Sequence, residues 1–148
     1  MSIKNRYVRL ATSGDSAALA ELNKKFNGVE RSPIDIEKSL KETNEIVAVA
    51  VKSEEVVGFA CAQYFKSFCY PDLLGEITEM YVDENFRLLG LATHMIQFLE
   101  EELKSMGVTT VKVLTGDRNQ KALKTYMKAG YIQEDDRILQ KHLQDINL

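Results

Sequence analysis

The sequence predicts an α/β fold, a mixed β-sheet with helices packed on both faces, and three observations indicate it. Short apolar or alternating segments typical of strands stand between longer segments with apolar residues at helical spacing. Two strand patterns, residues 45–52 and 56–65, are joined by a short polar turn and form an antiparallel hairpin. A strand–helix–strand unit over residues 76–115 predicts a right-handed parallel crossover. The two kinds of pairing together indicate a mixed, mostly antiparallel sheet between helical layers.

Length and composition limit the class of protein. The chain has 148 residues, the length of one domain (1–148), and 45% of them are apolar. A net charge of −3 argues against a nucleic-acid partner. No stretch approaches the roughly 18 consecutive apolar residues of a membrane span. Cys61 and Cys69 lack partners at the spacing of a metal site or a disulfide scaffold, so we expect a cytoplasmic protein with reduced thiols and no metal.

The first half of the chain predicts a strand and two helices before the hairpin. A strand over 3–10 is followed by Asp15, a candidate cap for the first helix. The apolar residues of that helix recur at helical spacing: Ala18, Leu19, Leu22 and Phe26. Ser32 and Pro33 are typical of a second helix start, as N-cap and first helical residue, and this helix is expected to end near Thr43.

The second half predicts the strongest helix of the chain, which follows a loop over 66–74 and a strand over 76–82. Its apolar face is formed by Ala92, Met95, Ile96, Leu99, Leu103 and Met106, and Gly107 ends it. Further elements are expected at 108–115 (strand), 119–129 (helix), 131–132 (strand) and 137–143 (strand). The sum is a sheet of about six to seven strands with about four helices.

The clearest chemical signature lies in the turn between the strand over 76–82 and the long helix. A helix N-terminus presents unpaired backbone N–H groups and a partial positive charge, which favour an anion. Gly90 lets the backbone approach a ligand closely, Ala92 keeps the approach open, and Arg87 adds a cation that can pair with phosphate. Neither a Walker A loop nor a dinucleotide fingerprint is present, so the turn is a candidate anion site of another kind.

Two motifs in register resemble the GNAT-type acyl-CoA N-acyltransferases. The family pattern Gln/Arg-x-x-Gly-x-Gly/Ala reads here as Arg87-Leu88-Leu89-Gly90-Leu91-Ala92, although Leu88 and Leu89 replace the basic residue or glycine of many relatives. The second pattern reads Asn119-x-x-Ala122-x-x-x-Tyr126, followed by Gly130-Tyr131. The opening Tyr7–Thr12 also resembles the first strand of the family, so the resemblance covers essentially the whole chain. It implies the GNAT fold and acetyl-CoA as cosubstrate.

The resemblance implies which residues contact acetyl-CoA. The pyrophosphate is expected on backbone N–H groups of Leu88 to Thr93, with Arg87 nearby. The pantetheine arm is expected to pair like a strand with residues 80–82, where the sheet opens toward residues 111–115. The expected cofactor-binding residues are Met80, Tyr81, Val82, Arg87, Leu88, Leu89, Gly90, Leu91, Ala92, Thr93, Asn119, Ala122 and Tyr126.

The resemblance also implies catalytic candidates. Tyr126 matches the tyrosine that protonates the departing thiolate. Glu76 is the first candidate for the general base, through a water that Thr78 also holds, and Glu79 is the second. Strand alternation puts Glu76 on the face of Thr78 and Met80. Glu79 then lies on the other face, unless a bulge changes the phase. A backbone N–H near Met80 is a candidate for stabilising the oxyanion.

Two classes of function remain open at this point. The first is an N-acetyltransferase in which a primary amine attacks the thioester directly in a ternary complex. Its acceptor is a small amine, aminoglycoside- or polyamine-like, or a protein amine, and the negative net charge suits cationic acceptors. The second is a non-catalytic acetyl-CoA-binding or sensing module. Tyr64, Tyr81 and residues 66–74 and 26–30 are candidates for the acceptor pocket. Many relatives are homodimers, so a homodimer is a further expectation.

Overall fold

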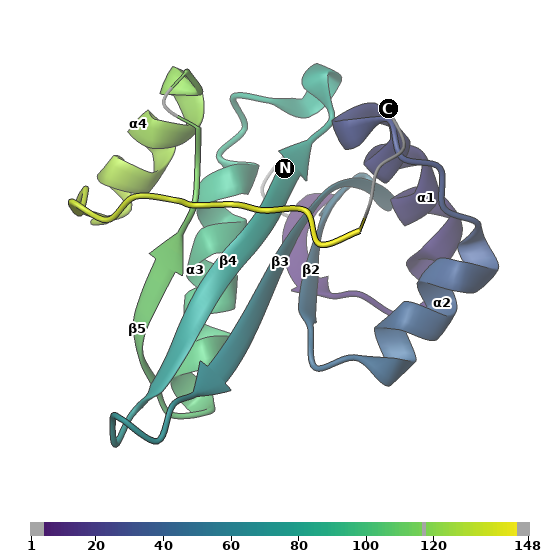
Figure 1. Ribbon diagram of the computed structural model, residues 1–148. Helices are drawn as coiled ribbons and strands as arrows, with labels where there is room; N and C mark the ends of the chain where they lie inside the picture. The colour runs from purple at the N-terminus through teal and green to yellow at the C-terminus, as the bar shows by residue number, and fades with distance from the viewer. Residues whose placement is uncertain (1–4, 117, 145–148) are drawn as a thin grey trace.

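The computed structural model describes residues 5–116 and 118–144, and its centre is a five-stranded sheet in the order β1-β2-β3-β4-β5 (Figure 1). Strands β1 to β4 pair antiparallel with their neighbours, whereas β4 and β5 pair parallel. The mixed, mostly antiparallel sheet expected from the sequence is therefore confirmed. The strands are β1 (Arg6–Leu10), β2 (Ile46–Lys52), β3 (Glu55–Lys66), β4 (Leu73–Val82) and β5 (Val108–Val113).

Within the described residues four α-helices accompany the sheet, and side chains cap two of them, at Ser32 as the sequence predicts and at Asn119. At the start of α2, Ser32 Oγ accepts a hydrogen bond from the Asp35 N–H (3.1 Å), and Pro33 is the first helical residue. At the start of α4, Asn119 Oδ1 accepts from the Ala122 N–H (3.2 Å). The helices are α1 (Ser16–Asn27), α2 (Pro33–Glu42), α3 (Leu91–Ser105) and α4 (Gln120–Lys128), with 3₁₀ turns η2 (Ser13–Asp15) and η3 (Glu84–Phe86). Within the described ranges, no helix has the length and apolar character needed to cross a membrane.

Asp15 fixes the passage from β1 to α1 through its carboxylate. The two oxygens accept hydrogen bonds from the Arg9 guanidinium at 2.7 and 2.9 Å, and one of them also accepts from the Thr12 N–H at 2.8 Å. The hydrogen bond from Arg9 holds the pKa of this buried carboxyl below its usual range. Asp15 thus ties turn η2 to β1, and its side chain makes no capping hydrogen bond to α1.

Two apolar layers flank the sheet because successive side chains of a strand point to opposite faces. Helix α3 covers one face, and Figure 1 shows it behind the strands. Its buried residues pack there against small or branched strand residues: Met95, Ile96, Leu99 and Leu103 against Ala48, Ala50, Ala60, Ala62 and Ile77. On the other face, α1 contributes Leu19 and Leu22 to a second core with Val47, Val49, Val51, Phe59 and Cys61. We call these layers the α3 face and the α1 face.

The two strands expected at residues 131–132 and 137–143 are absent. The described chain after α4, residues 129–144, contains neither helix nor strand. The prediction was wrong because an apolar pattern makes a strand only where a neighbouring strand pairs with it. Ile132, Ile138 and Leu139 are 78%, 64% and 95% exposed, so this pattern buries nothing. The described residues therefore form five strands, slightly fewer than the six to seven expected.

Several element ends also differ from the expected ones. β4 begins at Leu73, earlier than position 76, and β3 continues to Lys66, so the connection between them is residues 67–72. β5 ends at Val113 and does not reach position 115. Residues 3 and 4 of the expected first strand lie outside the described residues.

Replacement of Leu99 tests the core on the α3 face. Leu99 is fully buried, so Leu99→Ala should lower the free energy of unfolding by about 2–5 kcal/mol. The control is Leu139→Ala, which removes the same atoms from a side chain that is 95% exposed and should change stability by less than about 0.5 kcal/mol. Urea denaturation measures both values. Similar losses in the two variants would contradict the description of residues 129–144.

Candidate active site

Strand β4 separates from β5 halfway along its length, which leaves an open backbone edge. The parallel pairing begins at Leu73, opposite Val108, and ends at Ile77, opposite Val113. Residues 79–82 stay paired with β3 on their other side, and among the described residues 78–82 have no partner strand on the β5 side. Backbone N–H and C=O groups of such an edge are free to bind an extended ligand that carries amide groups. The opening expected between residues 80–82 and β5 is present.

A β-bulge lies at the point where the edge becomes free. Cys61 of β3 is opposite Glu79, but the next residue, Ala62, is opposite Ile77, so Thr78 is the additional residue. The Thr78 hydroxyl lies 3.4 Å from the Cys61 carbonyl oxygen, to which it donates a hydrogen bond. Bulges bend a strand and change which face its side chains occupy.

The bulge overturns the expected arrangement of side chains on β4. Ile77 and Met80 both pack into the α3 face although three positions separate them. Glu79 is opposite Cys61, a residue of the α1 face, and Glu76 is opposite Gln63, two residues further along β3. Glu76 and Glu79 therefore share the α1 face, whereas uninterrupted alternation had placed them on opposite faces.

The turn before α3 has the backbone conformation that an anion site needs. Gly90 has φ of 76°, and Leu88 adopts a similar left-handed conformation with φ of 67°. The first hydrogen bond of the helix runs from the His94 N–H to the Gly90 carbonyl at 3.1 Å. The N–H groups of Leu91, Ala92 and Thr93 therefore have no acceptor within the helix. They carry the partial positive charge of the helix start. A Cβ at Gly90 would meet nothing within 4 Å, so this part of the turn is open.

Two arginines brace the turn. Arg87 Nε donates to the Val82 carbonyl oxygen at 2.9 Å, and its guanidinium lies 5.6 Å from the centre of the Tyr81 ring. Arg6 of β1, which the sequence did not single out, donates to the Leu89 carbonyl oxygen at 3.1 Å. Both cations hold the backbone of the turn, and a phosphate there would lie in a positive environment.

Asp83 ties the end of β4 to helix α1. Its carboxylate accepts a hydrogen bond from Lys25 Nζ at 2.8 Å and from the Asn85 N–H at 3.1 Å. Its own N–H donates to the Val57 carbonyl at 2.8 Å. The Lys25 ammonium holds the pKa of this buried carboxyl below its usual range, so the pair stays ionised at neutral pH. Asp83 thereby anchors the strand end from which the turn departs.

Tyr126 lies in the core of the α3 face. It is 6% exposed, and burial raises the pKa of its phenol to about 12, so the hydroxyl keeps its proton at neutral pH and can donate it. Its ring packs edge-on against Tyr131 at 5.6 Å, and the Tyr131 hydroxyl donates to a Glu100 carboxylate oxygen at 2.7 Å. The candidate acid and the carboxylates of β4 thus lie on opposite sides of the sheet that opens between β4 and β5.

Three groups that the sequence did not connect converge on the α1 face. An oxygen of Glu45, the Sγ of Cys61 and an oxygen of Glu79 all lie within 4.8 Å of one another. Burial and the Glu79 carboxylate raise the pKa of Glu45. Burial and the two carboxylates raise the pKa of the Cys61 thiol above its usual range. These residues belong to three segments far apart in the sequence, so no local motif could have linked them.

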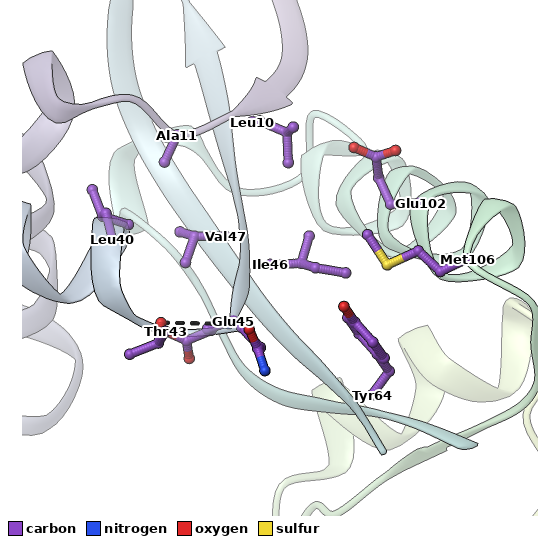
Figure 2. Close-up of a pocket in the computed structure, with 11 residues that line it drawn as sticks. Leu10, Ala11, Leu40, Thr43, Glu45, Ile46, Val47, Tyr64, Glu102 and Met106 are labelled. Carbon is purple, nitrogen blue, oxygen red and sulfur yellow. Dashed lines mark hydrogen bonds between the residues drawn. The ribbon is translucent and has the colours of Figure 1, made fainter. Parts of the chain in front are cut away.

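A separate pocket of about 270 Å³ lies where β1 ends, at the other end of α3 (Figure 2). Its walls combine polar residues (Thr43, Asn44, Glu45, Tyr64 and Glu102) with apolar ones (Leu10, Ala11, Leu40, Ile46, Val47 and Met106). Glu102 stands eleven residues beyond Leu91, a distance of roughly 16 Å along a helix. Tyr64, expected near the acceptor, therefore lines a pocket distinct from the turn at Gly90.

Comparison with known proteins identifies the class to which this site belongs. A family model described as Acetyltransferase (GNAT) family matches residues 17–131, so the chain belongs to the GNAT acetyltransferase family. The resemblance seen in the two motifs is confirmed, and membership implies acetyl-CoA as cosubstrate. The protein is an acetyltransferase.

Solved structures share the fold at low sequence identity. An aminoglycoside acetyltransferase from an uncultured soil metagenomic sample, in complex with sisomicin, has a TM-score of 0.84 and 16% identity, covering 98% of this chain and 100% of that one. A ribosomal-protein-alanine N-acetyltransferase from Brucella melitensis biovar Abortus 2308 has a TM-score of 0.79 and 14% identity, covering 93% and 99%. These similarities show the fold.

Replacement of Gly90 tests whether the turn binds acetyl-CoA. Gly28 offers a matched control, because it has φ of 75° and a Cβ there would also meet nothing within 4 Å. Gly90→Val and Gly28→Val should each lose about 1–2 kcal/mol of stability from the left-handed backbone. Only Gly90→Val should weaken acetyl-CoA binding, by about tenfold or more, because its side chain fills the space above the helix start. Isothermal titration measures the affinities, and equal affinities in both variants would place the phosphates elsewhere.

Proposed function

We propose that this acetyltransferase moves the acetyl group of acetyl-CoA to the primary amine of a small polycationic acceptor. The observation that carries the proposal is the free edge of β4 at residues 78–82. This edge lies between a helix start that favours anions and a sheet face that carries carboxylates. A donor with a phosphate end fits the helix start, and its amide-bearing arm fits the free edge of β4. A cationic acceptor fits the sheet face that carries carboxylates.

Backbone groups hold the donor in this proposal. The N–H groups of Leu91, Ala92 and Thr93 bind the pyrophosphate, and the free edge of β4 pairs with the pantetheine amides. Bound acetyl-CoA supplies the activated thioester. The site fits it because the turn at Gly90 is open and the β4 edge is unpaired. Leu88 and Leu89 bring no charge to the turn, so affinity depends on backbone donors and the bracing arginines.

Two carboxylates of β4 are candidates for the general base, which takes a proton from the acceptor ammonium. Glu76 lies in the part of β4 that is still paired, opposite Lys112 of β5. Glu79 lies beyond the last β4–β5 pair, beside the opening. This placement favours Glu79 as the base, with Glu76 as the alternative that acts through a water.

Tyr126 is the proposed general acid for the departing thiolate. Its phenol remains protonated at neutral pH because burial raises its pKa to about 12. In this proposal the phenol donates its proton to the sulfur that leaves. A backbone N–H near Met80 at the bulge is the proposed donor to the oxyanion.

The charge of the α1 face supports a cationic acceptor. Glu45, Glu76 and Glu79 all lie on this face, and in the described part of the chain none of them forms a salt bridge. Three carboxylates without a salt bridge attract a polycation. The fold is similar to that of an aminoglycoside acetyltransferase, and this similarity is compatible with a small polycationic amine as acceptor.

Thiol release with a panel of amines tests the proposed function. The purified chain with acetyl-CoA should release free thiol faster with polyamines and aminoglycosides than with peptides carrying a free N-terminus or lysine, and mass spectrometry should find the acetyl group on nitrogen. A peptide as best acceptor would overturn the acceptor class. Binding of acetyl-CoA without turnover on any amine would favour the sensing module.

Tyr126→Phe tests the acid. This variant should lower kcat by about 10²–10⁴-fold, the usual contribution of a positioned acid, while the affinity for acetyl-CoA stays nearly the same. Tyr131→Phe is the control, since it removes a hydroxyl that packs beside Tyr126 but bonds to Glu100. Equal rates for Tyr126→Phe and the wild type would remove the acid role.

The pH profile distinguishes the two candidate bases. Glu79→Gln should slow the reaction most at low pH, because an amine that has already lost its proton needs no base, and the deficit should shrink as pH rises. Glu76→Gln should show a smaller deficit. A larger deficit in Glu76→Gln would assign the base to Glu76, and unaltered profiles in both variants would exclude a carboxylate base on β4.

A further inference from the structure

Leu88 adopts a backbone conformation that a leucine rarely takes. Its φ of 67° lies in the left-handed region, where the Cβ of any residue other than glycine is crowded. The side chain is fully exposed, so packing of Leu88 itself offsets none of this cost. Residues in such conformations persist only where the surrounding structure fixes them, and they gather at functional sites. The contacts of the neighbouring residues therefore have to hold Leu88 in place.

Arg6 makes the contact that is best placed to do so. Its guanidinium, from the first residue of β1, donates to the Leu89 carbonyl oxygen at 3.1 Å, although the two residues are 83 positions apart in the sequence. That carbonyl belongs to a peptide that lies between Leu88 and Gly90, the two left-handed residues of the turn. The Leu89 side chain packs against the core of the α3 face, which anchors the same residue from a second side.

The other arginine of the turn acts on the segment before Leu88. Arg87 Nε donates to the Val82 carbonyl oxygen at 2.9 Å, so it ties the chain to the end of β4. Leu88 is therefore held between two braced neighbours, Arg87 and Leu89. Of the two arginines, only Arg6 comes from outside the strand–turn–helix segment, and it couples the turn to the first strand of the sheet.

We propose that Arg6 is a positioning residue, which keeps Leu88 left-handed and thereby keeps the helix start open to the pyrophosphate of acetyl-CoA. This inference rests on the proposed binding of the pyrophosphate at residues 91–93. Relaxation of Leu88 to a negative φ would reorient the peptides in front of that helix start. The affinity for acetyl-CoA then falls with the fraction of molecules that have the competent turn. Arg6 acts on the conformation of the turn and needs no contact with the phosphates.

A double-mutant cycle of Arg6→Gln and Leu88→Gly tests this role. Arg6→Gln should weaken acetyl-CoA binding by about tenfold or more, because it removes a hydrogen bond from a charged donor. Glycine populates the left-handed region as readily as the right-handed one, so Leu88→Gly alone should bind within about threefold of the wild type. In the Leu88→Gly background, Arg6→Gln should then cost no more than about threefold. Isothermal titration measures the four affinities.

Arg9→Gln is the matched control. It removes an arginine of the same strand, whose guanidinium binds the Asp15 carboxylate at 2.7 Å. This variant should lower the Tm, because Asp15 loses its partner, and it should keep the affinity for acetyl-CoA. A loss of affinity in Arg9→Gln equal to that in Arg6→Gln would mean that any disturbance of β1 weakens binding, and it would overturn the specific role of Arg6.

The coupling between the two substitutions decides the result. An equal loss from Arg6→Gln in both backgrounds would overturn the positioning role and indicate a direct contact with the phosphates. No loss from Arg6→Gln in the wild-type background would remove Arg6 from the site. If circular dichroism shows that Arg6→Gln does not fold, Arg6→Lys, which keeps the charge and moves the donor, is measured in both backgrounds and judged by the same coupling.

Gly90→Val, measured in the same series, separates a failure of this inference from a failure of the proposed site. If Gly90→Val binds acetyl-CoA like the wild type, the phosphates lie elsewhere and both proposals fail. If Gly90→Val loses binding and the cycle shows no coupling, the inference about Arg6 alone is overturned.

Discussion

The fold of this acetyltransferase depends on the difference in length between two neighbouring strands. β4 has ten residues and β5 has six, so their hydrogen-bonded pairing ends at Ile77. Backbone groups of β4 beyond that point need partners, because unpaired polar groups away from water are unfavourable. The chain places a helix start directly after this edge, at Leu91. An open strand edge and a positive helix start together make a site for a long ligand with an anionic end.

The bulge at Thr78 decides what faces that opening. It shifts the alternation of β4 by one residue, so Met80 packs with Ile77 on the α3 face, while Glu79 joins Glu76 on the α1 face. Tyr126 stays on the α3 face with a proton that burial retains. One additional residue in one strand therefore puts Glu79, like Glu76, on the face opposite Tyr126. It also brings Glu79 beside Cys61, where the convergence with Glu45 arises.

Local sequence signals predicted most of the fold but only part of the site. The period of α3, the glycine of the turn and the cap at Ser32 are local, and each is present. The bulge could be foreseen only as a possibility, because it depends on the register between β4 and β3. The group of Glu45, Cys61 and Glu79 needs three strands to be adjacent. The prediction of two final strands was wrong because a strand also needs a neighbouring strand. Ile138 and Leu139 have a strand-like pattern, but in the described residues no strand pairs with them.

Amide hydrogen exchange in the presence and absence of acetyl-CoA tests the central claim most directly. If the free edge of β4 and the start of α3 hold the cosubstrate, the amides of residues 91–93, and those amides of residues 78–82 that point away from β3, should exchange more slowly when acetyl-CoA is bound. The paired residues of β1 and β2 should change little, because they are already protected by the sheet. Saturating acetyl-CoA with no added protection at residues 78–82 and 91–93 would contradict the account.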